Sequence, residues 1–178
     1  MNTFSGYILT SILGWNIKGN FPNLNKSIVI FAPHTSWYDG LIGKLYLTEM
    51  GIRHRFLSKR ELFFFPMNLI MKWYGSIPVN RGKDDIFKVS EILSKHVNMH
   101  LVLSPEGTRE NVTDWKKGFY YIAKRADIPI VVGYIDYSKK EIGVIKTIDH
   151  MDSLVDIMKS LSNIYNSSMA RFPEKFAS

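Results

Sequence analysis

A histidine and an aspartate five residues apart have the types and spacing to do chemistry in this chain. His34 follows a short apolar run, residues 27–32, with the length and β-branched content of a buried strand. Asp39 precedes a helix-like segment, residues 40–50, and can serve as its N-cap. An aspartate that holds one imidazole nitrogen leaves the other free to take a proton. We therefore predict that His34 is a general base and that Asp39 orients its ring.

Taken alone, this pair also fits a polar loop beside a helix cap, and a second stretch shifts the interpretation toward a site. Ser104-Pro105-Glu106-Gly107-Thr108-Arg109 follows another short apolar run. Gly107 permits a positive φ or a close backbone approach, and Arg109 offers a planar fork of donors that matches a phosphate. Lys117 precedes a predicted helix, so its ammonium and the helix amides can add to an anion site. The alternative for Glu106 is a salt bridge to Arg109 or to another neighbour.

Strands and helices alternate along the chain. The patterns predict strands near residues 15–18, 27–32, 53–58, 76–79, 101–103, 129–136 and 141–146, and helices near 3–14, 40–50, 62–74, 84–96, 118–126 and 152–164. The last two strands are joined by a tight turn, so we expect them to be antiparallel. The order indicates one layered α/β domain over residues 1–178, with a mixed, mostly parallel sheet flanked by helices.

Four sequence blocks resemble those of a known enzyme family. H-x-x-x-x-D at His34 and Asp39, followed by P-E-G-T-R at 105–109, is similar to the glycerolipid acyltransferases of the lysophosphatidic acid acyltransferase type. Residues 75–81 resemble the family's second block, G-x-I-x-V-x-R, and residues 128–132 resemble the fourth, V-P-I-V-P. The blocks occur in the family's order, and the resemblance implies a fold like that of glycerol-3-phosphate acyltransferase.

The resemblance implies an O-acyltransferase of phospholipid synthesis. Such an enzyme moves a fatty acyl group from a thioester donor, acyl-CoA or acyl carrier protein, to the hydroxyl of a phosphate-bearing lysolipid, here 1-acyl-glycerol-3-phosphate. A hydroxyl needs a base when it attacks, and an imidazole with an ordinary pKa of about 6.5 suits that task. The thioester is already activated, so neither a covalent enzyme intermediate nor a cofactor is expected. The residues that the resemblance ties to the phosphate-bearing acceptor are Arg81, Glu106, Gly107 and Arg109, and Thr108 of the same motif is a further candidate for substrate binding.

Two positions depart from the family pattern. Pro33 stands where the family usually has Asn, and Gly133 follows Val132 where the fourth block usually ends in Pro. The second departure leaves the acceptor open, so an amino-acid lipid or a saccharide lipid is an alternative substrate. The alternative from another class is a membrane-surface lipid-binding protein on a non-catalytic acyltransferase scaffold. The intact pair of His34 and Asp39 argues against that alternative.

Composition excludes several function classes. The 178 residues suit one domain with a sizeable core, and 46% of them are hydrophobic, which argues against disorder. The sequence has no cysteine, so disulfides, thiol nucleophiles and thiolate metal sites are excluded. His96 and His100 have a metal-ligand spacing, but no carboxylate completes a site, and we expect both to be structural. The net charge of +7 favours phosphate ligands or anionic lipid, while the lack of any nucleic-acid-binding motif argues against nucleic acid.

Two apolar stretches are candidates for contact with a membrane. No apolar run reaches the length of a span and the N-terminus lacks signal features, so we expect a cytoplasmic protein attached peripherally to the anionic cytoplasmic face. Residues 1–14 hold a predicted helix that either packs on the core or lies in the interface. Leu62–Tyr74 is apolar on nearly every side, which fits a core helix and an interfacial helix equally well.

Overall fold

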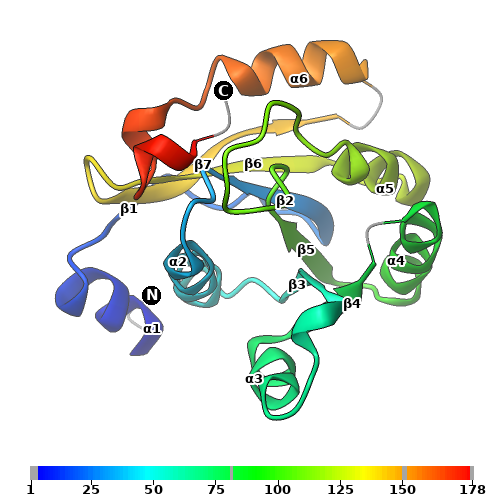
Figure 1. Cartoon of the computed structure of the whole chain (residues 1–178), viewed down its shortest axis with the longest axis horizontal. Coiled ribbons are helices and arrows are strands. Elements are labelled where there is room, and N and C mark those ends of the chain that lie inside the picture. The colour runs from blue at the N-terminus through cyan, green and yellow to red at the C-terminus, as the bar shows by residue number, and fades with distance from the viewer. Residues whose placement is uncertain (1–3, 81, 150–151, 177–178) are drawn as a thin grey trace.

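The computed structural model describes residues 4–80, 82–149 and 152–176, in which helices flank a central sheet (Figure 1). The strands are β1 (Asn16–Lys18), β2 (Lys26–Ala32), β3 (His54–Lys59), β4 (Ser76–Val79), β5 (Met99–Leu103), β6 (Ile130–Asp136) and β7 (Glu141–Ile148). The helices are α1 (Phe4–Tyr7), α2 (Trp37–Glu49), α3 (Met67–Tyr74), α4 (Lys83–Lys95), α5 (Gly118–Ala126) and α6 (Leu154–Ser162). A π-helical turn at Ile8–Ile12 continues α1, and short 3-10 turns lie at Arg60–Leu62, Ser167–Met169 and Pro173–Lys175.

The strands of the described residues lie in the order β1-β7-β6-β2-β5-β3-β4. Neighbouring strands are parallel except β6 and β7, which form the predicted antiparallel pair. At the centre, Val29 of β2 is in register with Val102 of β5 and Val131 of β6. The predicted fold class, an α/β domain with a mixed and mostly parallel sheet flanked by helices, is therefore confirmed.

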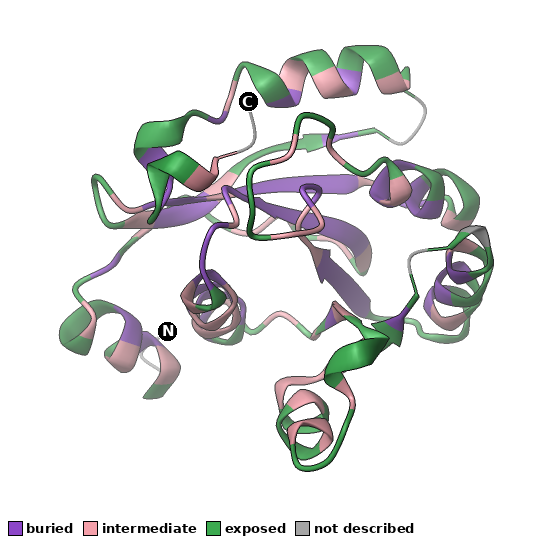
Figure 2. Ribbon diagram, viewed as in Figure 1, coloured by how far each residue is buried: buried purple, intermediate pink, exposed green. Residues whose placement is uncertain are grey.

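Side chains on the two faces of β2 enter two separate cores. Ile28 and Ile30 pack in the core that includes α4, α5 and α6. Val29 and Phe31 point the other way and pack with α2 and the N-terminal segment. Figure 2 shows the buried central strands between these helices. Because both faces are covered, β2 is apolar along almost its whole length, as parallel strands in such sheets are.

Helix α2 begins earlier than predicted, and its N-cap is Ser36 rather than Asp39. The Ser36 hydroxyl accepts a hydrogen bond from the amide of Tyr38, and Asp39 is the third helical residue of a capping box. The carboxylate of Asp39 accepts from the amide of Ser36 at 2.7 Å. The prediction that Asp39 caps the helix was therefore wrong in position, because a serine that can cap stands three residues earlier.

Helix α3 lies on the outside of the sheet's β4 edge (Figure 1). None of its residues is buried, and its Trp73 is 74% exposed. Phe65, in the turn before the helix, is 78% exposed. Of the two interpretations of Leu62–Tyr74, the structure excludes a core helix. Among the described residues, no helix combines the length and apolar character needed to cross a membrane.

Gly133, a departure from the family pattern, lies at an irregularity in the pairing of β6 with β7. A Cβ at this position would stand 2.5 Å from the ring of Phe31, which belongs to the buried core under α2. The Gly133 carbonyl also accepts a hydrogen bond from the Tyr165 hydroxyl at 2.6 Å. Glycine therefore fits this position because proline, like any residue with a Cβ, would collide with Phe31.

Candidate active site

The site residues follow three neighbouring strands at the edge of the sheet where each of these strands ends. His34 comes after β2, Glu106 after β5 and Tyr137 after β6. Since β2 pairs in parallel with both β5 and β6, the carboxyl ends of all three strands lie side by side. This edge is where open α/β sheets commonly place their ligands.

His34 and Asp39 meet across the turn between β2 and α2. The Nδ1 atom of His34 lies 3.2 Å from Oδ2 of Asp39. The His34 side chain is 29% exposed, whereas that of Asp39 is 3% exposed. Because an ionised carboxylate only accepts, Nδ1 carries the proton and Nε2 is the free basic nitrogen of the neutral ring. No described residue donates a hydrogen bond to Nε2.

The carboxylate of Asp39 is held on every side. Oδ2 accepts from the amides of Thr35 at 2.8 Å and Ser36 at 2.7 Å. Oδ1 accepts from the hydroxyl of Tyr137 at 2.6 Å. Burial and the adjacent Asp39 carboxylate raise the pKa of Tyr137 well above its ordinary value, so its hydroxyl stays protonated and donates. Asp39 is thus a fixed negative charge whose position and orientation are set before any substrate arrives.

Glu106 points back toward His34 rather than out to solvent. Its Oε1 accepts from the backbone amide of His34 at 3.0 Å, and Oε2 accepts from the hydroxyl of Ser104 at 2.6 Å. Burial raises the pKa of the Glu106 carboxyl, while the two hydrogen bonds oppose that shift. The alternative salt bridge to Arg109 does not form. Glu106 therefore fixes the backbone that carries His34 and links the two sequence motifs.

The C-terminal segment crosses the first motif and reaches the second. The Phe172 amide donates to the Thr35 hydroxyl at 3.2 Å, and Nη1 of Arg171 lies 3.5 Å from the Ser36 hydroxyl oxygen. The Arg171 guanidinium sits 4.8 Å from the centre of the Tyr38 ring. In the other direction, the Lys175 ammonium donates to the carboxylate of Glu110 at 2.9 Å. Arg171 is exposed and places a positive charge beside Ser36 of the first motif.

The other predicted anion ligands lie in the loop after β5. Gly107 has φ 67°, and a positive φ is one of the two roles that the sequence left open for this glycine. Thr108 accepts from the amide of Glu110 at 3.4 Å. Arg109 and Lys117 are exposed, and within the described parts of the chain neither side chain makes a hydrogen bond or an ion pair. Arg81 lies outside the described residues.

The loop between β5 and α5 folds back on itself, and this brings Lys117 close to the second motif. The amide of Lys116 donates to the carbonyl of Pro105 at 2.6 Å, which places the start of α5 beside the strand end that carries Glu106. Arg109 and Lys117 are thus two cations on one closed loop, and in the described residues neither has a side-chain partner.

Metal chemistry finds no support in the described part of the chain. No group of three or more His, Asp or Glu residues there could hold an ion. His100 is buried in β5 and exchanges a hydrogen bond with the hydroxyl of Ser27 at 2.8 Å. His96 is the C-cap residue of α4. The two histidines are structural elements of different segments rather than ligands on one helix.

Comparison with known proteins identifies the family. The profile of the acyltransferase family matches residues 15–135, more than half of the chain. The chain belongs to the acyltransferase family. It is therefore an enzyme of that family, and the matched range contains both motifs and all of β2, α2, β5 and α5.

Two known proteins are similar to this acyltransferase. Human 1-acyl-sn-glycerol-3-phosphate acyltransferase beta is 32% identical over 122 residues, which are 64% of this chain and 43% of the human protein. The chain thus spans less than half the length of that relative. The crystal structure of PlsC, the 1-acyl-sn-glycerophosphate acyltransferase of Thermotoga maritima, superposes with a TM-score of 0.63 over 90% of this chain and 73% of that one. At 17% sequence identity this likeness shows a shared fold.

Two residues at the site of this acyltransferase were missed by sequence reasoning. Tyr137 directly follows β6, and the rule that neighbouring strand ends converge could have pointed to it. Arg171 lies beyond the residues matched by the family, in a segment with no periodic pattern. No signal in the sequence places it beside Ser36, which is 135 residues away.

Proposed function

We propose that this acyltransferase transfers a fatty acyl group from a thioester donor to the hydroxyl of a phosphate-bearing lysolipid, with 1-acyl-glycerol-3-phosphate as the acceptor. The observation that carries this proposal is the contact of His34 with the buried Asp39, which leaves Nε2 as a base. The choice of acceptor is supported by the similarity to human 1-acyl-sn-glycerol-3-phosphate acyltransferase beta and by the position of Arg171 beside Ser36. Acyl-CoA and acyl carrier protein are the two donors considered.

In the proposed reaction, Nε2 of His34 removes the proton of the acceptor hydroxyl while its oxygen attacks the thioester carbonyl carbon. The tetrahedral intermediate collapses, the carbon–sulfur bond breaks, and the thiolate takes the proton from the imidazolium. The Asp39 carboxylate, 3.2 Å from Nδ1, stabilises that imidazolium while it exists. No side chain of the protein is acylated.

The serines of the two motifs support this direct transfer, because both hydroxyls already have structural tasks. Ser36 caps α2, and Ser104 donates to Glu106. For the phosphate of the acceptor we propose Arg109, Lys117 and Arg171, together with Arg81 by the family resemblance. Arginine forks and a lysine at the start of a helix suit a phosphate group.

The function is tested with purified protein and a panel of acceptors read by mass spectrometry. We expect acylation of 1-acyl-glycerol-3-phosphate and weaker acylation of the matched monoacylglycerol, which lacks the phosphate. His34→Ala should lower the rate by at least about 10²-fold, the usual range of general base catalysis being about 10²–10⁴. Its fold should survive because Glu106 binds the backbone amide of His34, which the variant keeps.

His96→Ala, which removes an exposed histidine away from the site, is the matched control and should keep wild-type activity. A folded His34→Ala protein that acylates at the wild-type rate would rule out the mechanism. Preference for an amino-acid lipid or a saccharide lipid would keep the mechanism and replace the acceptor. Lipid binding without turnover of any acceptor would favour the non-catalytic alternative.

We also propose that the enzyme attaches to the membrane surface through α3 and the turn before it. The exposed apolar side chains Phe64, Phe65, Leu69, Ile70 and Trp73 form what we call the α3 patch. Phe4, Tyr7 and Ile12 of the N-terminal segment are also exposed, although Leu9 between them is buried in the core. Aromatic side chains next to a lysine suit the layer between headgroups and acyl chains.

Flotation with vesicles tests this attachment. Replacing Phe64 and Phe65 with Asp should reduce flotation while leaving the thermal melt near that of the wild type, because both rings are exposed. Val97→Asp with Val155→Asp is the control, since it adds the same charge at two exposed apolar side chains elsewhere. Equal loss in both double variants would show that charge alone matters. Wild-type protein that never floats with anionic vesicles would refute the attachment.

A further inference from the structure

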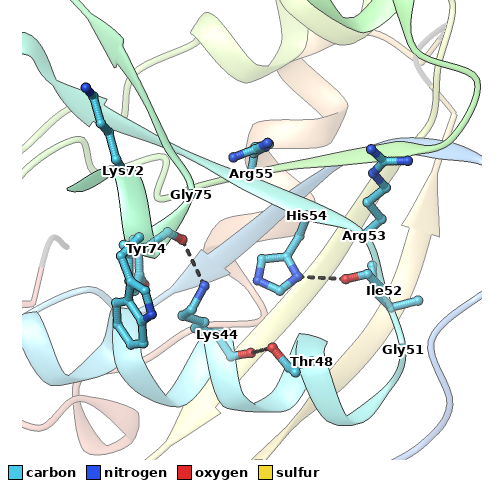
Figure 3. Close-up of a pocket in the computed structure, with 11 residues that line it drawn as sticks. Lys44, Thr48, Gly51, Ile52, Arg53, His54, Arg55, Lys72, Tyr74 and Gly75 are labelled. Carbon is cyan, nitrogen blue, oxygen red and sulfur yellow. Dashed lines mark hydrogen bonds between the residues drawn. The ribbon is translucent and has the colours of Figure 1, made fainter. Parts of the chain in front are cut away.

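A hollow in the molecule lies at the opposite end of the parallel strands from His34. It has a volume of about 420 Å³ and lies between the later turns of α2, the amino ends of β3 and β4, and the end of α3 (Figure 3). His34 follows the carboxyl end of β2, which runs parallel to β5 and, through it, to β3. The charged group of a molecule held in this hollow would therefore lie away from His34. The volume lies within the range of small-ligand sites.

The walls of this hollow, which we call the basic pocket, carry positive charge and no negative charge. Lys44, Arg53, Arg55 and Lys72 line it, and no Asp or Glu is among its lining residues. Across the described ranges of the chain, none of these four cations forms an ion pair. Like charges gathered without a counter-charge repel one another, and a bound anion relieves that repulsion.

The repulsion among these cations affects the pKa of Lys44. Burial, and next the charge of Arg55, lower the pKa of its ammonium. Its Nζ donates to the carbonyl of Tyr74 at 2.9 Å and lies 5.5 Å from the centre of the Trp73 ring. Figure 3 shows Lys44 reaching from α2 to the end of α3, with Arg55 on β3 beside it and Arg53 directly before that strand. Lys44 is thus held in place, and the two arginines, both exposed, are free to bind a ligand.

One wall of the basic pocket belongs to the helix that carries the α3 patch. Lys72 and Trp73 line the pocket, and Leu69, Ile70 and the exposed Trp73 ring point to the outside from the same helix. An anionic group in the pocket therefore has an apolar surface directly beside it. A phospholipid has both parts in one molecule, whereas free phosphate or a nucleotide has only the anionic one.

We propose that the basic pocket binds the phosphate of an anionic phospholipid headgroup while the α3 patch enters the acyl layer. Arg53 and Arg55 contact the phosphate, and Lys44 and Lys72 complete the charge around it. The bound lipid holds the enzyme at the membrane and leaves the catalytic edge free to take its substrates. The lipid as the source of the phosphate rests on the membrane attachment proposed above.

Vesicle binding of a charge variant tests the site. Arg53→Gln with Arg55→Gln removes two charges from the pocket, and neither residue belongs to the proposed catalytic or acceptor site. Lys88→Gln with Lys159→Gln removes two charges from exposed residues of α4 and α6, on the other face of the sheet. On vesicles of phosphatidylglycerol in phosphatidylcholine, the pocket variant should bind about 10–30-fold more weakly, and the control should change far less. Equal weakening of the two variants would overturn the proposal.

Soluble probes separate the pocket from the membrane attachment. Dihexanoyl phosphatidylglycerol below its micelle concentration should change the fluorescence of Trp73 saturably, measured as the difference between wild type and Trp73→Phe. The pocket variant should lose this response, and its turnover of a short-chain soluble acceptor should stay at the wild-type rate. Absence of the response in the wild type would overturn the proposal even if the protein floats. A response in a protein that does not float would refute the membrane attachment alone.

Coenzyme A and inorganic phosphate are the competing probes. We expect both to displace the short-chain lipid only weakly, because they lack the apolar part that meets the α3 patch. Saturable binding of coenzyme A with no binding of the lipid would overturn the assignment to a lipid headgroup.

Discussion

Replacing Asp39 with asparagine removes the charge beside His34 and keeps the shape of the side chain. The amide oxygen can take the place of Oδ2 and accept from the amides of Thr35 and Ser36. The amide NH₂ then faces Tyr137, whose hydroxyl can turn to accept. Every buried group thus keeps a partner, so the variant isolates the charge.

The cost of Asp39→Asn in stability follows from three hydrogen bonds. A hydrogen bond to a charged group contributes about 1.5–3 kcal/mol and a neutral one about 0.5–1.5 kcal/mol. Two backbone amides and one hydroxyl donate to the carboxylate, so the change costs about 3 kcal/mol in the free energy of unfolding. Asp39→Ala instead leaves these donors without an acceptor, at about 1–3 kcal/mol each. That sum approaches the whole stability of a domain, so the alanine variant is the less informative one.

Asp39→Asn should also slow catalysis in the protein that remains folded. Loss of the charge weakens stabilisation of the imidazolium by at least about 1.4 kcal/mol, a factor of about 10 in rate. The upper bound is the whole contribution of a general base, about 10²–10⁴-fold. We expect kcat to fall within these limits while the KM for the acceptor changes little, because Asp39 contacts the base and not the lipid.

The assay is initial-rate acylation of 1-acyl-glycerol-3-phosphate, with a urea melt of the same preparation. The melt shows that the protein is folded under assay conditions, which separates lost chemistry from lost structure. A folded Asp39→Asn enzyme with kcat within about twofold of the wild type would refute the assignment of Asp39 as the partner of the base.

Two further predictions concern the anion site and the buried glutamate. Arg109→Ala and Arg171→Ala should each lower kcat/KM for the phosphorylated acceptor about tenfold or more, since a charge-assisted hydrogen bond contributes about 1.5–3 kcal/mol, and should affect the monoacylglycerol less. Equal loss with both acceptors would assign these arginines to structure or donor binding. Glu106→Gln keeps an acceptor for the His34 amide and removes an ionisable group whose pKa burial raises above 4.5. As pH rises from 4.5 through the raised pKa, the unfolded wild-type chain ionises first and the wild type loses stability, so the melting temperature of the variant minus that of the wild type should grow. A difference that stays constant from below pH 4.5 to neutral pH would contradict this pKa direction.

Local patterns in the sequence determined most of the elements and the meeting of His34 with Asp39. Three local signals act over only a few positions: the alternation of apolar residues, the turn residues and the residues that start helices. Hydrogen bonds within an element form between residues that are close in sequence, so these signals predict the elements. His34 and Asp39 are five residues apart on a strand end and a helix start, so the turn between these elements brings them together. Gly107 likewise has a positive φ, one of the two conformational roles that its residue type allows. These features depend on short stretches of chain that have few other ways to fold.

Only the tertiary structure decided which residues surround His34 and Asp39. Tyr137 reaches Asp39 across 98 residues, and Arg171 reaches Ser36 across 135, because parallel strand ends and the C-terminal segment converge on one edge of the sheet. The apolar stretch Leu62–Tyr74 fits a core or a surface by composition. It is exposed because the sheet ends at β4 and no described segment forms a further layer over α3. Contacts between distant segments depend on how whole layers pack, and no local pattern encodes that packing.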